Sequence, residues 1–311
     1  MLTGRRAASL LRRAVAPTPA RLHVAPAESS HRRAVEAVVA SAPVTHAHVG
    51  AYFNEALRHG AGLWVLLDGA LVVGAIQRLR GVSWAIAPEV AESAATVAAL
   101  ADFVARWSAV QEIVFGPQAQ LQRVLSDAAP RGLATMELRQ QVMLRCDTPL
   151  LPALDSQSVT LRAAEPRDLE WLLRAHASMC REDLGVDQVA RNPEGYRRHF
   201  NELIQRNLCF VGESNGRPVF KAEAPVVSDQ AWMFEGVYTE TASRGRGIAT
   251  RAMAELTIQA AGRGFVPCLY VHRRNTGALH VYNRIGYREV TPWTTALVSR
   301  DAPSPGGPLM W

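Results

Sequence analysis

Cysteine is scarce in this chain, and its spacing fits neither a metal site nor a disulfide frame. The four cysteines among 311 residues are isolated, with no CxxC pair and no histidine at zinc-finger spacing. We therefore expect a reducing, cytoplasmic setting and no bound metal. Long apolar runs are absent as well: no stretch approaches the roughly 18 uninterrupted apolar residues of a membrane-spanning helix, so we expect no membrane partner.

Acidic residues are missing from the start of the chain, and this explains why the formal net charge of the whole chain is positive. Residues 1–27 carry five arginines and no acid, so they supply +5 of the formal net charge of +6 and leave +1 for the remainder. A basic tail is not a basic binding face, so we expect no nucleic-acid partner. The tail has two open interpretations: an organellar transit peptide, or an Ala/Arg-rich start in which residues 21–24 already form a strand.

What is present is enough apolar sequence for two cores. The chain is 48% hydrophobic and 20% charged, and a proline-bounded stretch at 147–152 interrupts its pattern. We expect domains at 21–147 and 155–300, with short tails at 1–20 and 301–311. Each half is predicted to contain antiparallel strands followed by helix, strand, helix and strand, which indicates an internal duplication in the α/β (α+β) class.

The expected elements follow from hydrophobic periodicity and turn residues. In the first half, helices are predicted at 30–41, 46–58, 89–108 and 117–128, and strands at 63–67, 70–77, 112–115 and 138–145. In the second half, strands are predicted at 159–163, 208–213, 218–227, 232–239, 268–272, 288–290 and 293–298, and helices at 165–179, 194–206, 245–262 and 275–284.

The most informative motif is a glycine turn between a strand and a helix, at Arg244-Gly245-Arg246-Gly247. Glycines there leave amides uncovered at a helix N-terminus, which suits phosphate oxygens. A P-loop is excluded because the turn has no lysine, and Thr250 stands where a Rossmann fingerprint needs its third glycine. A plain turn with solvated arginines stays open, and an NADP-linked enzyme is disfavoured by the strand order.

Further motifs surround this turn. Gly247 and Ala249 complete an Arg-x-x-Gly-x-Ala pattern, Asn275 follows about 30 residues later, and Tyr282 precedes Ile285-Gly286-Tyr287. Over about 157–298 the chain resembles the GNAT superfamily of acyl-coenzyme A-dependent N-acyltransferases. The resemblance implies tandem GNAT-like mixed, mostly antiparallel sheets flanked by helices.

A narrower resemblance is to a bacterial two-module group, in which an uncharacterised GNAT-like N-terminal domain precedes a catalytic one. It is carried by Glu182–Asp187, Val219–Glu223 and Leu269–Val271. This chain departs from that group at His272, where asparagine is usual, and at Glu235, where glutamine is common.

The resemblance also implies acetyl-CoA as co-substrate and assigns the residues that bind it. The strand end would bind the pantetheine arm, and the turn would bind the pyrophosphate. The cofactor-binding residues are then Val237, Tyr238, Thr239, Arg244, Gly245, Arg246, Gly247, Ile248, Ala249, Thr250 and Asn275.

Three groups of side chains are candidates for the chemistry. Tyr282 matches the family's general acid, although its spacing also fits a core aromatic. Glu235 and Glu223 are alternative bases, unless a water relay serves or both are ordinary strand carboxylates. Glu182, Asp183 and Asp187 lie in the expected acceptor loop, where acids attract a cationic amine; a solvated polar loop is the alternative.

The first half has no counterpart of the glycine turn. Residues 87–93 offer two carboxylates and no glycine there, and acids repel a pyrophosphate. We interpret 21–146 as a degenerate GNAT-like module. The expected function is an N-acetyltransferase acting on a small-molecule or protein amine as a monomer or homodimer. The alternative is a non-catalytic acyl-CoA-binding sensor or scaffold.

Overall fold

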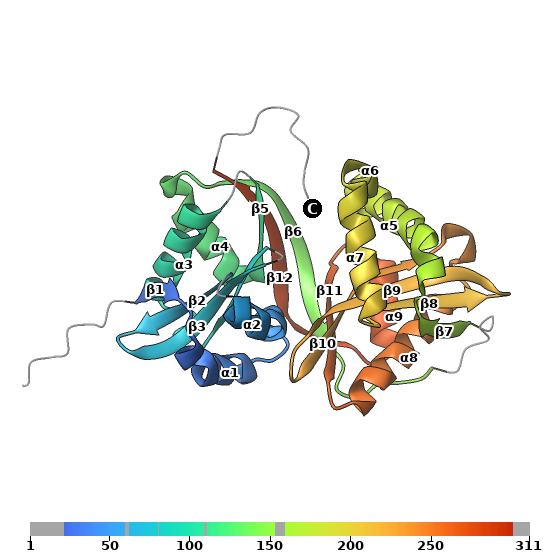
Figure 1. The fold of residues 1–311 in the computed structure, drawn as a ribbon, viewed down its shortest axis with the longest axis horizontal. Coiled ribbons are helices and arrows are strands. Elements are labelled where there is room, and N and C mark those ends of the chain that lie inside the picture. The colour runs from blue at the N-terminus through green and yellow to red at the C-terminus, as the bar shows by residue number, and fades with distance from the viewer. Residues whose placement is uncertain (1–21, 60–61, 80, 109–110, 153–158, 301–311) are drawn as a thin grey trace, which may run out of the picture.

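The structure is a computed structural model that describes residues 22–59, 62–79, 81–108, 111–152 and 159–300. Both predicted tails, and with them the question of a transit peptide, lie outside these residues. All strands belong to one mixed, mostly antiparallel sheet of 12 strands that runs through both halves (Figure 1). The predicted fold class is therefore confirmed, with one continuous sheet in place of two.

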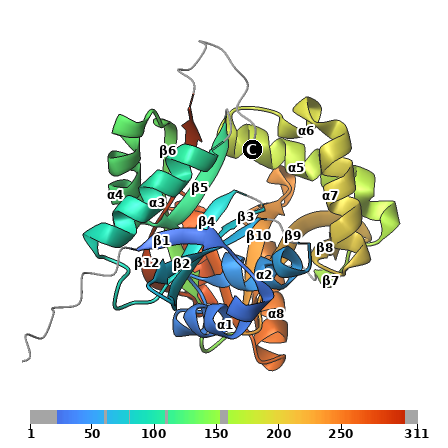
Figure 2. The ribbon, with the colours of Figure 1, turned by 60° about the vertical axis from the view of Figure 1, so that its left-hand side comes forward.

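The N-terminal half has two pairs of helices, and Figure 2 shows α1 and α2 well separated from α3 and α4. Its helix α3 begins at Ala94, because Ser93 caps it: the Ser93 hydroxyl accepts a hydrogen bond from the Thr96 amide at 3.1 Å. The elements are β1 (His23–Pro26), α1 (Arg32–Ser41), α2 (Ala47–His59), β2 (Leu63–Asp68), β3 (Leu71–Arg78), β4 (Val82–Ile86), α3 (Ala94–Trp107), β5 (Glu112–Pro117), α4 (Gln118–Ala128) and β6 (Ala134–Arg145).

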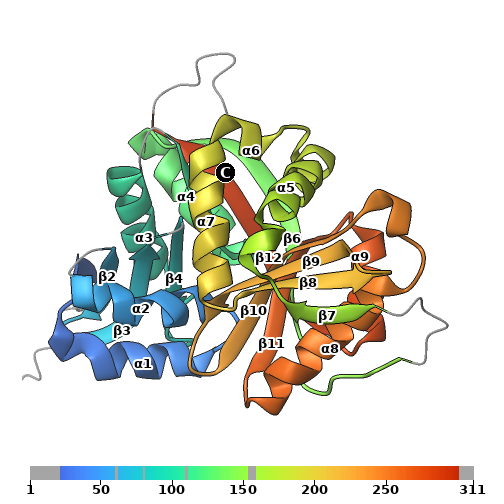
Figure 3. The same cartoon turned by 45° about the vertical axis from the view of Figure 1, so that its right-hand side comes forward.

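The C-terminal half repeats this order. Helices α5 and α7 pack against each other, as do α8 and α9 (Figure 3). The elements are β7 (Thr160–Ala163), α5 (Leu169–Leu184), α6 (Gln188–Arg191), α7 (Pro193–Gln205), β8 (Cys209–Ser214), β9 (Arg217–Val227), β10 (Ala231–Thr239), α8 (Ile248–Gly262), β11 (Val266–His272), α9 (Thr276–Arg284) and β12 (Arg288–Ser299).

The two halves exchange their last strands. The sheet order is β1-β2-β3-β4-β5-β12-β6-β11-β10-β9-β8-β7, so β12 pairs with β5 of the N-terminal half and β6 pairs with β11 of the C-terminal half. Strands β6 and β12 also pair with each other over almost their whole length. The residues that separate the halves in sequence, 147–152, thus follow β6, while the sheet itself continues through both halves.

A shared core fills the junction. One cluster of buried side chains draws on α2, β5 and β6 of the N-terminal half and on β9, β10, β11 and β12 of the C-terminal half. Its largest member, Trp293, is 1% exposed and stacks on Tyr270 with ring centroids 6.1 Å apart. Because this cluster contains side chains from both halves, each half stabilises the other.

Among the described residues, no helix has the length and apolar character needed to cross a bilayer. The four cysteines are all buried free thiols.

Candidate functional site

The sheet opens between two parallel neighbours, β10 and β11. Their pairing is limited to Ala231–Met233 against Val266–Cys268, so the rest of β10 diverges from β11. None of the described strands pairs with the edge of Phe234–Thr239 that faces β11, so this edge can pair with an extended ligand. Val237, Tyr238 and Thr239, all predicted to bind the cofactor, lie on this edge.

A bulge in β10 accompanies the divergence. On the other side of the strand, Glu235 pairs with Glu223 and Tyr238 pairs with Lys221, so three steps along β10 oppose two along β9. Gly236 lies in the bulge with φ +56°, a left-handed conformation that glycine adopts without steric cost.

The predicted anion-binding turn has the left-handed backbone conformation at both of its glycines. Gly245 and Gly247 both have φ +75°, and Gly247 is the N-cap of α8 without any side chain that could cap the helix. The N-terminus of α8 therefore offers amides and the positive end of its dipole to a ligand. Ile248 and Thr250 are buried in the first turn, so only their backbone groups are suited to such contacts.

The Arg244 side chain makes its hydrogen bonds within the protein. Its guanidinium donates to the Glu182 carboxylate at 2.7 Å and to the Thr239 carbonyl at 3.0 Å, and it lies 5.3 Å from the centre of the Tyr238 ring. Glu182, predicted to attract the acceptor, thus ties the end of α5 to the glycine turn. Arg246 is exposed beside this turn.

The other predicted loop acids divide between two roles. Asp187 caps α6 by accepting from the Ala190 amide at 2.9 Å, and it pairs with Arg181. Burial and the neighbouring Glu182 raise the pKa of Asp183, while Arg139 of β6 and His272 act against that rise. Asp183 is therefore the loop acid that lies near the open end of β11.

Tyr282 lies in the hydrophobic core of the C-terminal half, 5% exposed. Its ring centroid is 5.7 Å from that of Tyr287. Burial raises the pKa of Tyr282, and the negative charge of Asp183 raises it further. The phenol is thus neutral and able to donate a proton or a hydrogen bond. Its burial agrees with the core-aromatic interpretation, and the general-acid role stays a prediction.

The two candidate bases lie in different surroundings. Glu223 is 4% exposed, and both of its carboxylate oxygens are paired, Oε1 with Lys221 and Oε2 with His199 Nε2 at 3.1 Å. Burial alone raises the pKa of Glu223, but Lys221, His176 and His199 outweigh it and hold that pKa well below its ordinary value. Such a carboxylate is a weak proton acceptor.

Glu235, in contrast, lines a hollow of about 220 Å³ at the start of the opening. Glu235 and Tyr270 are each two residues beyond the last paired residues of β10 and β11, Met233 and Cys268. The hollow is lined by both halves: His48, Tyr52, Ile113, Phe115, Arg139 and Gln141 come from the first, and Val226, Glu235, Tyr270 and Thr295 from the second.

Asn275 is the N-cap of α9, and its side chain accepts from the Ala278 amide at 3.0 Å. It therefore fixes the start of the helix that carries Tyr282. No group of three or more histidine, cysteine or acidic side chains within the described ranges is arranged to hold a metal ion.

The corresponding opening in the N-terminal half is filled. Strands β4 and β5 pair only at Val82 and Val114, and a methyl group added at Gly116 on β5 would lie 3.5 Å from the Trp84 indole. Trp84 Nε1 donates to Gln120 Oε1 at 2.6 Å, and Gln120 Nε2 donates to the Ala91 carbonyl at 2.6 Å. Helix α3, which corresponds to α8, is capped by the side chain of Ser93, whereas α8 begins at a glycine.

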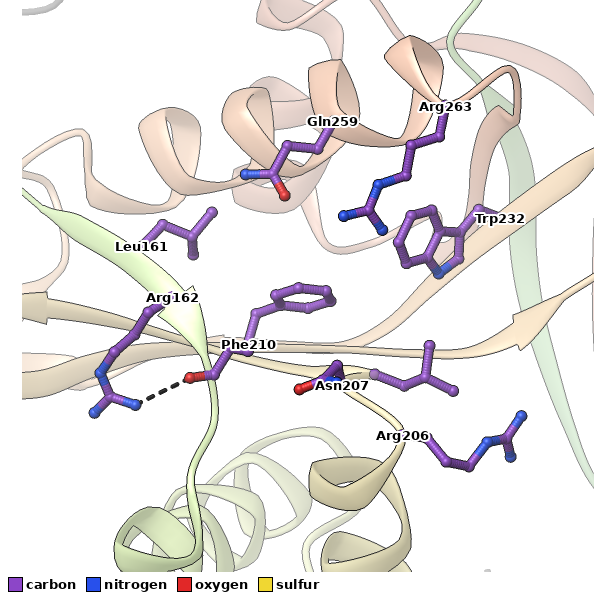
Figure 4. Close-up of a pocket in the computed structure, with 10 residues that line it drawn as sticks. Leu161, Arg162, Arg206, Asn207, Phe210, Trp232, Gln259 and Arg263 are labelled. Carbon is purple, nitrogen blue, oxygen red and sulfur yellow. Dashed lines mark hydrogen bonds between the residues drawn. The ribbon is translucent and has the colours of Figure 1, made fainter.

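A larger hollow, of about 590 Å³, lies near the C-terminal end of α8 (Figure 4). Arg263, the C-cap of α8, lies over the Trp232 indole there, with its guanidinium carbon 5.3 Å from the ring centre. Arg162 and Arg206, which also line it, are paired with carboxylates. The glycine turn is at the other end of α8, about 22 Å away for a helix of 15 residues, so this hollow is separate from the opening.

Two features of the site were not predicted from the sequence. One is the role of Lys221, which is completely buried. A lysine inside the apolar run Val219–Ala224, with a glutamate two residues later on the same strand face, was the available signal for a buried ion pair. The other is which residues of the first half line the hollow beside Glu235, because the strand exchange that joins the halves leaves no local signal.

Comparison with known proteins gives one family match. Residues 172–287 match the model of the acetyltransferase (GNAT) family, which spans the opening, the glycine turn and Tyr282. No curated protein matches the chain in sequence.

Several solved structures share the fold at low sequence identity. A GNAT-family acetyltransferase from Colwellia psychrerythraea is 14% identical, with a TM-score of 0.54 over 89% of this chain and 98% of its own. A GCN5-related N-acetyltransferase from Sphaerobacter thermophilus is 16% identical, with a TM-score of 0.54 over 90% and 96%. A tandem GNAT protein from the clavulanic acid biosynthesis pathway is 12% identical, with a TM-score of 0.56 over 91% and 100%. At these identities the likeness concerns the fold.

Proposed function

Because residues 172–287 match the model of the acetyltransferase (GNAT) family, we propose that the protein transfers an acetyl or related acyl group from acetyl-CoA to a primary amine. The observation that carries this proposal is the opening between β10 and β11, which leads to the uncapped N-terminus of α8. An open strand edge pairs with amide groups, and an uncapped helix start pairs with phosphates. Coenzyme A has both kinds of group along one chain.

In this proposal the backbone of Val237 and Thr239 binds the pantetheine arm, as an added strand would. The amides of 245–250 bind the pyrophosphate, because glycine at 245 and 247 leaves them uncovered. The contacts of Arg244 with Glu182 and Thr239 hold the turn in this conformation before the ligand arrives. Asn275 acts indirectly, by capping α9.

The acceptor amine binds in the hollow beside Glu235. A lysine-like amine is protonated at pH 7, and its deprotonation costs roughly 4–5 kcal/mol, from about 3.4 pK units at 1.36 kcal/mol each. Glu235 accepts this proton, directly or through a water, because it lines the hollow in which the amine binds. Asp183 attracts the cationic amine near the open end of β11.

The reaction is a direct attack. The amine nitrogen forms a bond to the thioester carbonyl carbon, and the bond from that carbon to sulfur breaks. The ammonium loses one proton before the attack, which Glu235 accepts and passes to water. The nitrogen loses a second proton as the bond to carbon forms, and this proton ends on the departing thiolate, directly or by way of the Tyr282 hydroxyl, which also donates a hydrogen bond to the sulfur. The buried phenol is protonated at neutral pH, as this role requires.

The N-terminal half, in the same proposal, is a degenerate module without cofactor binding. Trp84 and Gln120 fill its opening, and Ser93 caps its helix. Its contribution is to the acceptor side, because α2, β5 and β6 line the hollow beside Glu235.

The test is thiol release from acetyl-CoA, measured across a panel of polyamines, amino acids, aminoglycosides and lysine peptides. Amine-dependent release supports the proposal. If acetyl-CoA binds and no amine in the panel stimulates release, the non-catalytic acyl-CoA sensor replaces it. If acetyl-CoA does not bind, both are wrong.

A further inference from the structure

The bulge in β10 needs a hydrogen-bond partner that the sheet does not provide. An extra residue in one strand interrupts the ladder, so its carbonyl loses its place in the pairing. Here the carbonyl of Gly236 accepts a hydrogen bond from Lys221 Nζ at 2.8 Å. The donor comes from β9, directly across the bulge, and takes the place of a backbone amide.

Lys221 is held for this contact by a buried cluster. Its ammonium also donates to Glu223 Oε1, and it lies 3.5 Å from His176 Nδ1 and 5.6 Å from the centre of the Phe200 ring. A buried ammonium is stable only when its donors are paired, and these contacts meet that condition.

Glu223 shapes the bulge from the other side. A methyl group added at Gly236 would lie 2.3 Å from Glu223 Oε1 and 3.0 Å from Lys221 Nζ. The ion pair therefore touches the backbone of residue 236 closely, and any change in its position moves that peptide. The helices α5 and α7 in turn hold Glu223, through His176 and His199.

We propose that Lys221 and Glu223 form a buried positioning pair that sets the bulge of β10 and so the groove for the acyl-CoA arm. This inference rests on the proposed function, because it assigns the groove to acetyl-CoA. The bulge at 236 directly precedes Val237 and Thr239, whose backbone groups would pair with the ligand. The pair does not touch the reacting atoms and acts only through the backbone of β10.

A double variant, Lys221→Met with Glu223→Gln, tests the pair. Both charges are removed together and the side-chain volumes are nearly kept, so no unpaired charge remains in the core. The matched control is Arg162→Met with Asp168→Asn, a second partly buried pair of the same half with atoms 2.6 Å apart, in which Arg162 also pairs with Glu213 of β8. KM for acetyl-CoA, kcat and the thermal midpoint are measured for the parent and both variants.

We expect the double variant at 221 and 223 to raise KM for acetyl-CoA at least about tenfold, with kcat at saturation changed much less, while the control keeps the parent KM. A merely structural role would lower the thermal midpoint in both variants and leave KM unchanged in each. An unchanged KM in the folded double variant overturns the inference.

If the double variant does not fold, Gly236→Ala is measured instead. Its methyl group displaces the bulge without altering any charge, and the same rise in KM is expected. Should the parent fail to bind acetyl-CoA, the proposed function is wrong, and this outcome is distinct from a parent that binds and a folded variant that binds equally well.

Discussion

Removing the Tyr282 hydroxyl tests its proposed role as general acid, and the surroundings of this side chain indicate how large the loss in kcat should be. Tyr282→Phe deletes one oxygen and keeps the ring in the core against Tyr287. The ordinary pKa of tyrosine is about 10 and that of a thiol about 8.5, so full proton transfer to the thiolate is uphill by about 2 kcal/mol. Burial and the charge of Asp183 raise the pKa of Tyr282 further. The hydroxyl therefore acts mainly as a hydrogen-bond donor to the developing negative charge.

A hydrogen bond to a charged group contributes about 1.5–3 kcal/mol, which corresponds to a loss of about 10- to 150-fold in kcat. KM for acetyl-CoA should stay close to the parent value. Because the raised pKa keeps the phenol neutral, titration of Tyr282 should not lower kcat between pH 7 and 10. The assay is thiol release at saturating acetyl-CoA over that pH range.

Tyr287→Phe is the matched control. Tyr287 is equally buried, but its hydroxyl bonds to Thr257 Oγ1 at 3.1 Å, within the core. The variant should lose about 1 kcal/mol of unfolding free energy and keep the parent kcat. The reasoning is refuted if Tyr282→Phe keeps the parent kcat, or if both variants lose it equally.

Three further outcomes are expected. Gly245→Ala and Gly264→Ala both place a methyl group at a residue with positive φ, and no atom beyond the adjacent residues lies within 4 Å of either methyl group. Each variant should therefore lose about 1 kcal/mol of unfolding free energy. Only Gly245→Ala should weaken coenzyme A binding, as measured by calorimetry. Glu235→Gln should lower kcat/KM by about 10²- to 10⁴-fold without changing the affinity for coenzyme A; an unchanged rate would remove it as the base. Burial lowers the pKa of His46 and of His176, so the unfolded state binds more protons below about pH 6.5. The urea unfolding free energy should then fall from pH 7.5 to pH 5.5, and a rise would contradict this sign.

Local pattern was enough to predict most elements, and the failures have identifiable causes. Strand β4 was not predicted, because all five of its residues are buried and it shows no alternation. The strands predicted at 288–290 and 293–298 are one strand, β12, with a register shift between Glu289 and Thr291 where it pairs with β6. Periodicity shows which residues are buried but not against which strand, so the exchange of β6 and β12 had no signal.

The site, like the fold, has features that the local sequence predicted and others that depend on how the chain folds. The glycine turn was located correctly because positive φ at 245 and 247 restricts the sequence itself. Glu235 and Glu223 were equivalent in sequence, and only the surroundings of each carboxylate distinguish them. Lys221 was missed because a lone lysine in a strand is ordinarily exposed, and its burial depends on His176, Gly236 and Glu223 being brought together by the fold.

Titration calorimetry of the full chain with coenzyme A tests the central claim most directly, since every assigned role depends on the open edge of β10 and the start of α8 receiving that ligand. The account predicts saturable binding of one coenzyme A per chain, weakened by Gly245→Ala and unaffected by Gly264→Ala. Absence of binding, or equal binding by both glycine variants and the parent, would contradict it.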